Sequence, residues 1–179
     1  MNKVKTILLV DSDVARLCKA VNLLSQWEDE EIKKLHLVIA VSKSEGIRLL
    51  KLHNDQMRST GCRHIDAIVS HLNIIDGEEH EESNRVGESP LGLCLVAEAI
   101  KHQLPFILYS HKSWNGGKPR GVIHLFNALK LGEHLEFADP DVERSKRDIQ
   151  WVFFRVFQKL LKNSPVEVEQ LSEETVKTS

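Results

Sequence analysis

The side chains best suited to chemistry in this chain each stand at the end of a short apolar run. Asp11 follows the run T-I-L-L-V, His71 follows A-I-V-S, and Ser110 closes the run P-F-I-L-Y-S. A carboxylate, an imidazole and a hydroxyl can bind cations or transfer protons. If the three runs are parallel strands, these side chains meet at one edge of a sheet, where open α/β sheets bind their ligands.

Strands that would position these residues recur along the chain and alternate with helices. The stretch 6–10 ends just before Asp11, and the stretch 65–74 carries His71 at the end of a run that suits burial on both faces. The predicted strands are residues 6–10, 37–41, 65–74, 105–110 and 135–138. Five strand–helix repeats favour an α/β fold, a doubly wound five-stranded parallel sheet with helices on both faces.

Helical spacing of apolar residues follows each predicted strand. Asp13 is placed to cap the first helix, and Ser42 with Glu45 forms a capping-box pattern at the start of the second. These stripes predict the helix faces that pack on the sheet. For the first four helices they are Val14, Leu17, Val21 and Leu24, then Ile47, Leu49, Leu50 and Leu52, then Leu93, Val96, Ala97 and Ile100, then Val122, Leu125, Phe126 and Leu129.

The last predicted helix, residues 148–162, differs from the others because it carries two apolar stripes. An amphipathic helix needs only one such face, so the second stripe predicts an interface for a homodimer or another protein. The alternative is that a long helix simply covers more of the core. The stripe expected on the sheet comprises Ile149, Val152, Phe153, Val156, Phe157 and Leu160, and the second comprises Trp151, Phe154 and Leu161.

Composition indicates a globular domain and argues against several classes of function. The 179 residues are 41% hydrophobic and 28% charged, with 24 basic and 26 acidic side chains. This balance provides no basic field for nucleic acid, and no apolar run is long enough to span a membrane. Cys18, Cys62 and Cys94 lack redox or metal spacing, and the first residues leave no room for a signal peptide. We therefore expect a cytoplasmic protein with reduced cysteines.

Three segments interrupt the alternation of strands and helices. Residues 76–90 are acidic and poor in apolar side chains, and residues 112–121 are rich in turn formers, so both are expected to form loops at the same edge of the sheet. Residues 164–179 have no sustained period and are expected to fray. The remainder, residues 1–163, is expected to form a single domain interrupted by the two loops.

Four motifs in this order resemble those of a response-regulator receiver domain, the phosphoacceptor module of two-component signalling. They are I-L-L-V-D-S-D, D-A-I-V-S-H-L-N-I, P-F-I-L-Y-S-H and A-L-K-L-G-E-H-L-E-F-A-D-P, and the resemblance extends over residues 5–161. It implies a flavodoxin-like sheet with strand order 2-1-3-4-5. It also implies a role in signal transduction or a phosphorelay.

The resemblance assigns a family role to five positions of this chain, and most of them depart from the expected residue. The acceptor aspartate falls at His71, and the switch hydroxyl falls at Ser110. The first acidic residue falls at Asp11 and the second, usually a magnesium ligand, at Ser12. The lysine that steadies the acyl phosphate falls at Asp139. Only Asp11 and Ser110 keep the family's chemistry.

These departures predict a degenerate phosphoacceptor pocket. Magnesium needs several hard oxygen ligands, and Ser12 and His71 replace two carboxylates. Asp13 would supply another carboxylate, but its spacing favours a helix cap. An acidic Asp139 would repel a phosphoryl group rather than neutralise it.

Two hypotheses account for the altered pocket. In the first, His71 forms a hydrogen bond with Asp139 or Asp11 and fills the vacated site. In the second, Asp11, His71, His111 and Asp139 hold zinc or another transition ion, since two imidazoles and two carboxylates suit such metals. Chance grouping of histidines is favoured over the metal site, because the chain has nine histidines and no H-x-x-x-H spacing.

The sequence therefore predicts a stand-alone, degenerate receiver that is not an enzyme and needs no cofactor. It is expected to act as a protein-interaction module without ordinary phosphorylation. The expected partner is a histidine kinase, a regulator or another signalling protein, with no nucleic acid or membrane involved. One alternative is a metal-binding or enzymatic protein on the same fold. The other is a receiver phosphorylated on a non-standard residue such as Ser70 or Ser110.

Overall fold

The computed structural model describes residues 6–27, 34–60, 65–74, 91–110, 120–137 and 149–162. Its strands are β1 (Thr6–Val10), β2 (His36–Ala40), β3 (Ala67–His71), β4 (Phe106–Ser110) and β5 (Leu135–Phe137). Its helices are α1 (Val14–Gln26), α3 (Lys43–Thr60), α4 (Gly92–Lys101), α5 (Arg120–Ala128) and α6 (Ile149–Lys162), with a 3₁₀ turn η2 (Gly132–His134).

The strands form one parallel sheet in the order β2-β1-β3-β4-β5, which confirms the predicted flavodoxin-like topology. The register aligns Val10 with Ser70 and His71 with Tyr109. Because all strands point the same way, the residues that follow β1 and end β3 and β4 lie at the same edge. The topology therefore brings Asp11, His71 and Ser110 to one edge of the sheet, as predicted.

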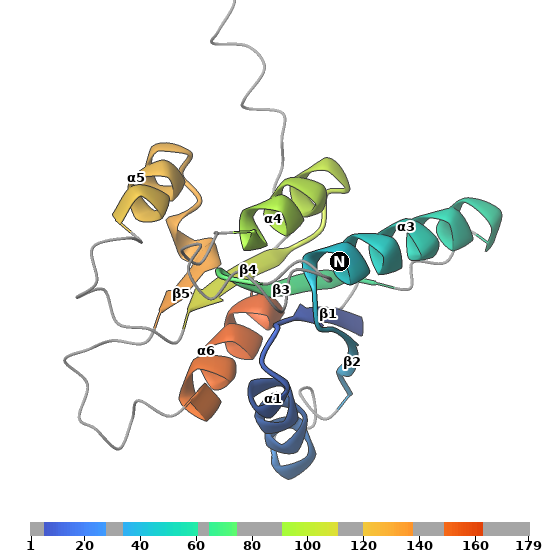
Figure 1. Cartoon of the computed structure of the whole chain (residues 1–179), viewed down its shortest axis with the longest axis horizontal. Coiled ribbons are helices and arrows are strands. Elements are labelled where there is room, and N and C mark those ends of the chain that lie inside the picture. The colour runs from blue at the N-terminus through green and yellow to red at the C-terminus, as the bar shows by residue number, and fades with distance from the viewer. Residues whose placement is uncertain are drawn as a thin grey trace, which may run out of the picture.

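Helices cover both faces of the sheet, as the doubly wound fold requires. Figure 1 shows α1 and α6 on one face and α3, α4 and α5 on the other. Alternate strand residues enter different cores: Ile7 and Leu9 pack with α1 and α6, whereas Leu8 packs with α3, α4 and α5. Burial on both sides explains why the strands are continuous apolar runs.

Both predicted helix starts are confirmed in atomic detail. The Asp13 carboxylate accepts the Arg16 N–H at 3.1 Å, which caps α1. The Ser42 hydroxyl oxygen accepts the Glu45 N–H at 3.2 Å, and the Glu45 carboxylate accepts the Val41 N–H at 2.9 Å. Val41 is thus drawn into the cap of α3, which explains why β2 ends at Ala40 and not at the predicted residue 41.

The predicted stripes on four helices are partly wrong, since Leu52 of α3 and Ala97 of α4 are exposed and α1 and α5 also differ. Leu17, Ala20 and Leu24 form the buried face of α1, while Val14 and Val21 are exposed. Val122 and Phe126 of α5 are buried, but Leu125 and Leu129 are exposed. In these helices the apolar positions extend around more of the surface than the sheet can cover, so periodicity alone could not select the buried side.

Helix α6 buries the described part of its first stripe, including Val152, Phe153 and Phe157, as predicted, and the side chain of Ile149 lies outside the described residues. The second stripe also makes contacts within the chain. Phe154 stacks on Trp27 at the end of α1, with ring centroids 4.4 Å apart, and Leu161 packs against the same core. The side chain of Trp151 lies outside the described residues.

Two of the predicted irregular segments fall almost wholly outside the described residues, as does the tail. Residues 75–90, 111–119 and 163–179 are not described. The second predicted loop, residues 112–121, extends two residues too far at its end, because Arg120 and Gly121 already belong to α5. Cys18 and Cys94 are free thiols and Cys62 is outside the described part. No helix within the described ranges combines the length and apolar character needed to cross a membrane.

Candidate functional site

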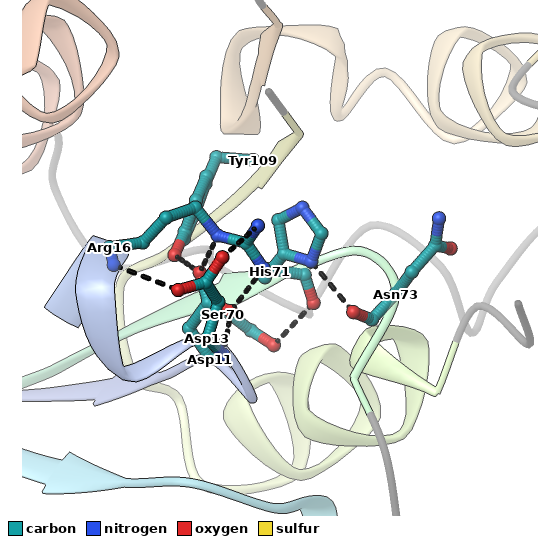
Figure 2. A network of polar contacts seen from close by, with 7 residues as sticks. All are labelled: Asp11, Asp13, Arg16, Ser70, His71, Asn73 and Tyr109. Carbon is teal, nitrogen blue, oxygen red and sulfur yellow. Dashed lines mark hydrogen bonds and ion pairs between the residues drawn. The ribbon is translucent and has the colours of Figure 1, made fainter. Parts of the chain in front are cut away.

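The centre of the candidate site is Asp11, whose side chain is fully buried directly after β1. Figure 2 shows groups from the start of α1 and from β4 converging on its carboxylate. Arg16 donates from Nε to Oδ2 at 2.7 Å and from Nη2 to Oδ1 at 2.6 Å. The Tyr109 hydroxyl donates to Oδ2, and the Asp13 N–H donates to Oδ1 at 2.9 Å. Both carboxylate oxygens of Asp11 are therefore occupied by donors from the protein itself.

Arg16 also reaches the second carboxylate of this segment. Its Nη1 lies 2.9 Å from Oδ2 of Asp13, so the guanidinium contacts both Asp11 and Asp13. The first turn of α1, capped by Asp13, brings the Arg16 side chain back over the end of β1. A planar guanidinium with several donors suits this two-carboxylate geometry.

Sequence reasoning missed Arg16, although a signal was present. Basic residues are unfavourable in the first turn of a helix, because the positive end of the helix dipole lies there. Arg16 occupies that turn and follows Asp11 and Asp13 in the order D-S-D-x-x-R. A basic residue in this unfavourable place indicates a local acidic partner.

Tyr109 of β4 was also not recognised as a site residue. The register pairs it with His71, and both share the sheet face of Asp11. Its ring packs edge-on against His71 and against Phe153 of α6, with centroids 5.2 Å apart in each case. A tyrosine on a core-facing strand position needs a partner for its hydroxyl, and this requirement could have pointed to Asp11.

The charges of the site are mutually stabilised. Burial alone would raise the pKa of Asp11, but the Arg16 hydrogen bonds, the charge of His71 and the Tyr109 hydroxyl lower it below its ordinary value. Burial alone would lower the pKa of Arg16, but the hydrogen bonds and charges of Asp11 and the charge of Asp13 raise it above its ordinary value. The pKa of Tyr109 is raised well above its ordinary value by burial and by the neighbouring Asp11 charge. The site therefore favours an ionised Asp11, a charged Arg16 and a neutral Tyr109.

His71 is buried at the end of β3, but it does not contact Asp11 in the way the sequence suggested. Its Nδ1 lies 2.7 Å from the carbonyl oxygen of Asn73. A carbonyl only accepts, so Nδ1 carries a hydrogen. Arg16 and Tyr109 take the Asp11 oxygens in place of the predicted imidazole, and His71 acts on Asp11 through its charge. The other predicted partner, Asp139, lies outside the described residues.

The serines at this edge of the sheet do not belong to the network of hydrogen bonds around the Asp11 carboxylate that is described above. Ser110 is buried at the end of β4, on the strand face opposite to Tyr109. The Ser70 hydroxyl donates to the carbonyl oxygen of His71 at 3.0 Å. Ser12 is half-buried next to Asp11. The alternation of the strands thus separates Ser110 from Asp11 and His71, although all lie at one edge.

Of the four residues proposed for a metal site, the described part of the chain contains only Asp11 and His71. His111 and Asp139 lie outside it. Within the described ranges, no group of three or more histidine, cysteine, aspartate or glutamate side chains is arranged to hold a metal ion. The oxygens of Asp11 are instead bonded to Arg16 and Tyr109.

Titration of tyrosine offers a direct test of this electrostatic arrangement, since Tyr109 is the single tyrosine of the chain. Its folded-state pKa is raised from an ordinary value of 10.0, so its stabilising contribution is present below that pH and is lost as the pH rises through the higher folded value. We expect no tyrosinate absorbance at about pH 10 in the native protein, and ionisation near pH 10 in urea.

The control for this titration is the variant Asp11→Asn, which removes the negative charge next to the hydroxyl. We expect ionisation of Tyr109 to move to lower pH in this variant, because burial remains but the Asp11 charge is gone. A native protein that forms tyrosinate near pH 10 would contradict the contact between Tyr109 and Asp11.

Comparison with known proteins gave matches in structure only: no family model matches the chain, and no curated protein matches it. A response regulator receiver domain from Rhodospirillum rubrum superposes with a TM-score of 0.52 at 10% identity, covering 89% of this chain and 96% of that chain. A receiver domain protein from Methanospirillum hungatei JF-1 gives 0.49 at 18%, covering 88% and 94%. A signal receiver domain of an HD domain-containing protein from Pseudomonas fluorescens Pf-5 gives 0.49 at 18%, covering 89% of each chain. The fold of this chain is that of response-regulator receivers.

Proposed function

We propose that this chain, which has the response-regulator receiver fold, acts in signal transduction as a protein-interaction module that does not depend on phosphorylation. The observation that carries the proposal is the identity and the bonding of the residue that ends β3. His71 stands where the receiver resemblance places the acceptor aspartate, and its Nδ1 is engaged by the carbonyl of Asn73. An imidazole cannot form the acyl phosphate that a carboxylate forms.

The surroundings of His71 support the same proposal. A phosphoacceptor site needs cationic groups that neutralise the incoming phosphoryl oxygens. Among the described residues, the guanidinium next to Asp11 is that of Arg16, and it is bonded to Asp11 and Asp13. We infer that the protein functions through binding rather than through catalysis.

The proposed partner is a protein, either another signalling protein such as a histidine kinase or a second copy of this chain, in the cytoplasm. Leu125 on α5 and Leu129, just after its end, are four residues apart and exposed, and Phe154 on α6 is half-buried. Exposed apolar side chains at this spacing suit contact with another protein. Light scattering of a Phe154→Glu variant tests the homodimer. If Phe154 lies in a dimer interface, the variant should have a lower solution mass than wild type. An unchanged mass would show that Phe154 is not part of such an interface.

Incubation with acetyl phosphate and MgCl₂, followed by intact-mass measurement, tests the proposed independence from phosphorylation. We expect no phosphoryl adduct on the wild-type protein, because the strand-end acceptor carboxylate is replaced by His71. A receiver that retains its acceptor aspartate serves as the positive control for the donor.

A phosphoryl adduct on the wild-type chain would overturn the proposal. The variants Ser70→Ala and Ser110→Ala then locate it. Loss of the adduct in either variant would establish phosphorylation on that hydroxyl, which is the alternative function raised by the sequence.

A further inference from the structure

The contacts of Arg16 are those of a cation bound between two carboxylates. Its guanidinium makes two hydrogen bonds to Asp11, at 2.6 and 2.7 Å, and an ion pair with Asp13 at 2.9 Å. Each distance is in the range of strong, charge-assisted contacts. The contacts use three different nitrogens of one side chain, so Arg16 bridges the two carboxylates.

Asp11 needs a positive charge near it in the folded protein. Asp11 is fully buried, and an uncompensated buried carboxylate is strongly unfavourable. Divalent cations such as Mg²⁺ and Mn²⁺ commonly bind to one or two carboxylates and complete their coordination with water. Arg16 supplies a positive charge here through contacts with both carboxylate oxygens of Asp11 and one of Asp13.

We propose that Arg16 is a built-in counter-cation that closes the Asp11–Asp13 carboxylate pair to divalent metal ions. The site is then held permanently in a cation-neutralised state, without dependence on the metal concentration. This inference goes beyond the proposed function, since it concerns only cation binding and holds whether or not the chain binds a protein partner.

The geometry of the neighbouring groups indicates that the pair would remain in place without Arg16. The Tyr109 hydroxyl and the Asp13 N–H also bind Asp11, so two donors to its carboxylate remain when the guanidinium is removed. The side chain of Arg16 is 16% exposed and that of Asp13 is 41% exposed, so the site borders on solvent. An ion that retains several waters could therefore reach the carboxylates once Arg16 is removed.

Thermal unfolding in the presence of EDTA or MnCl₂ tests the proposal with Arg16→Met, which keeps the length of the side chain and removes its charge. We expect MnCl₂ near 100 times its dissociation constant to raise the melting temperature of this variant by roughly 5–10 °C. The wild-type protein should show a much smaller change. Arg48→Met is the matched control, because Arg48 is an exposed arginine on α3, and it should behave as wild type.

A third variant, which also changes a carboxylate, tests whether the metal binds at the proposed pair. Adding Asp13→Asn to Arg16→Met should abolish most of the response to MnCl₂. If Arg16→Met does not fold in EDTA, recovery of its folded far-ultraviolet circular dichroism in MnCl₂ would support the proposal. Equal stabilisation of wild type and Arg16→Met by MnCl₂, or no response of Arg16→Met, folded or unfolded, would overturn it.

Discussion

Truncation of Phe153 to alanine is expected to lower the free energy of unfolding by about 3–5 kcal/mol. Phe153 of α6 is fully buried against the sheet and packs against the rings of Tyr109 and Phe157. Its removal would lose the transfer free energy of the ring and leave a cavity between α6 and the sheet. Urea unfolding followed by circular dichroism measures the loss.

Phe154→Ala is the matched control, since it removes the same ring from the next position of α6. Phe154 is only half-buried, and its ring stacks on Trp27 at the margin of the core. We expect a loss of about 1–2 kcal/mol, because less surface is buried and solvent can fill the space. An equal cost for the two variants would contradict the burial difference between the two stripes of α6.

Replacing Gly92 with alanine is expected to destabilise the protein by about 2–3 kcal/mol, although alanine is favoured over glycine within helices by about 1 kcal/mol. A Cβ atom at this position would lie 2.3 Å from the carbonyl oxygen of His71 and 3.0 Å from that of Leu72. Gly92 also donates its N–H to the Leu72 carbonyl at 3.0 Å. Helix α4 could not move away from the added methyl without stretching this hydrogen bond.

Gly46→Ala, in α3, separates this backbone clash from ordinary crowding. The nearest atoms to its Cβ would be the side-chain methyl groups of Leu95 and Val10, both at 3.2 Å. Side chains can shift by the few tenths of an ångström required, and the gain in helix propensity offsets part of the cost. We expect a change within about 1 kcal/mol, measured by the same urea titrations. A neutral Gly92→Ala variant would show that the end of β3 is not rigidly held by α4.

Gly92 links the fold to the candidate site. The close approach of α4 to the His71 carbonyl, together with the Ser70 hydroxyl bond to the same oxygen, fixes the backbone at the end of β3. The position of the imidazole and its contact with Asn73 depend on that backbone. Packing of a helix on the opposite face of the sheet therefore contributes to the geometry of a site on the other face.

The sequence by itself determined the order of strands and helices and the parallel topology. These features are encoded locally: continuous apolar runs report burial on both faces, and Asp13 or Ser42 at a helix start satisfies orphan backbone donors. The edge on which Asp11 and His71 lie then follows from strand direction alone. The substitution of an imidazole for the expected carboxylate at this edge was likewise visible in the sequence.

Only the tertiary structure decided which side chains in the site bind one another. Arg16, Tyr109 and Asp11 come from a helix, a strand and a strand end, and 98 positions separate Tyr109 from Asp11. Periodicity carries no information on such pairs, because they depend on strand register, helix rotation and side-chain rotamers together. The same dependence explains why Val14 and Val21 are exposed while Ala20 is buried. The sequence pattern of a helix or strand indicates how much of its surface is apolar. Only the packing of the folded protein determines which of its side chains are in contact.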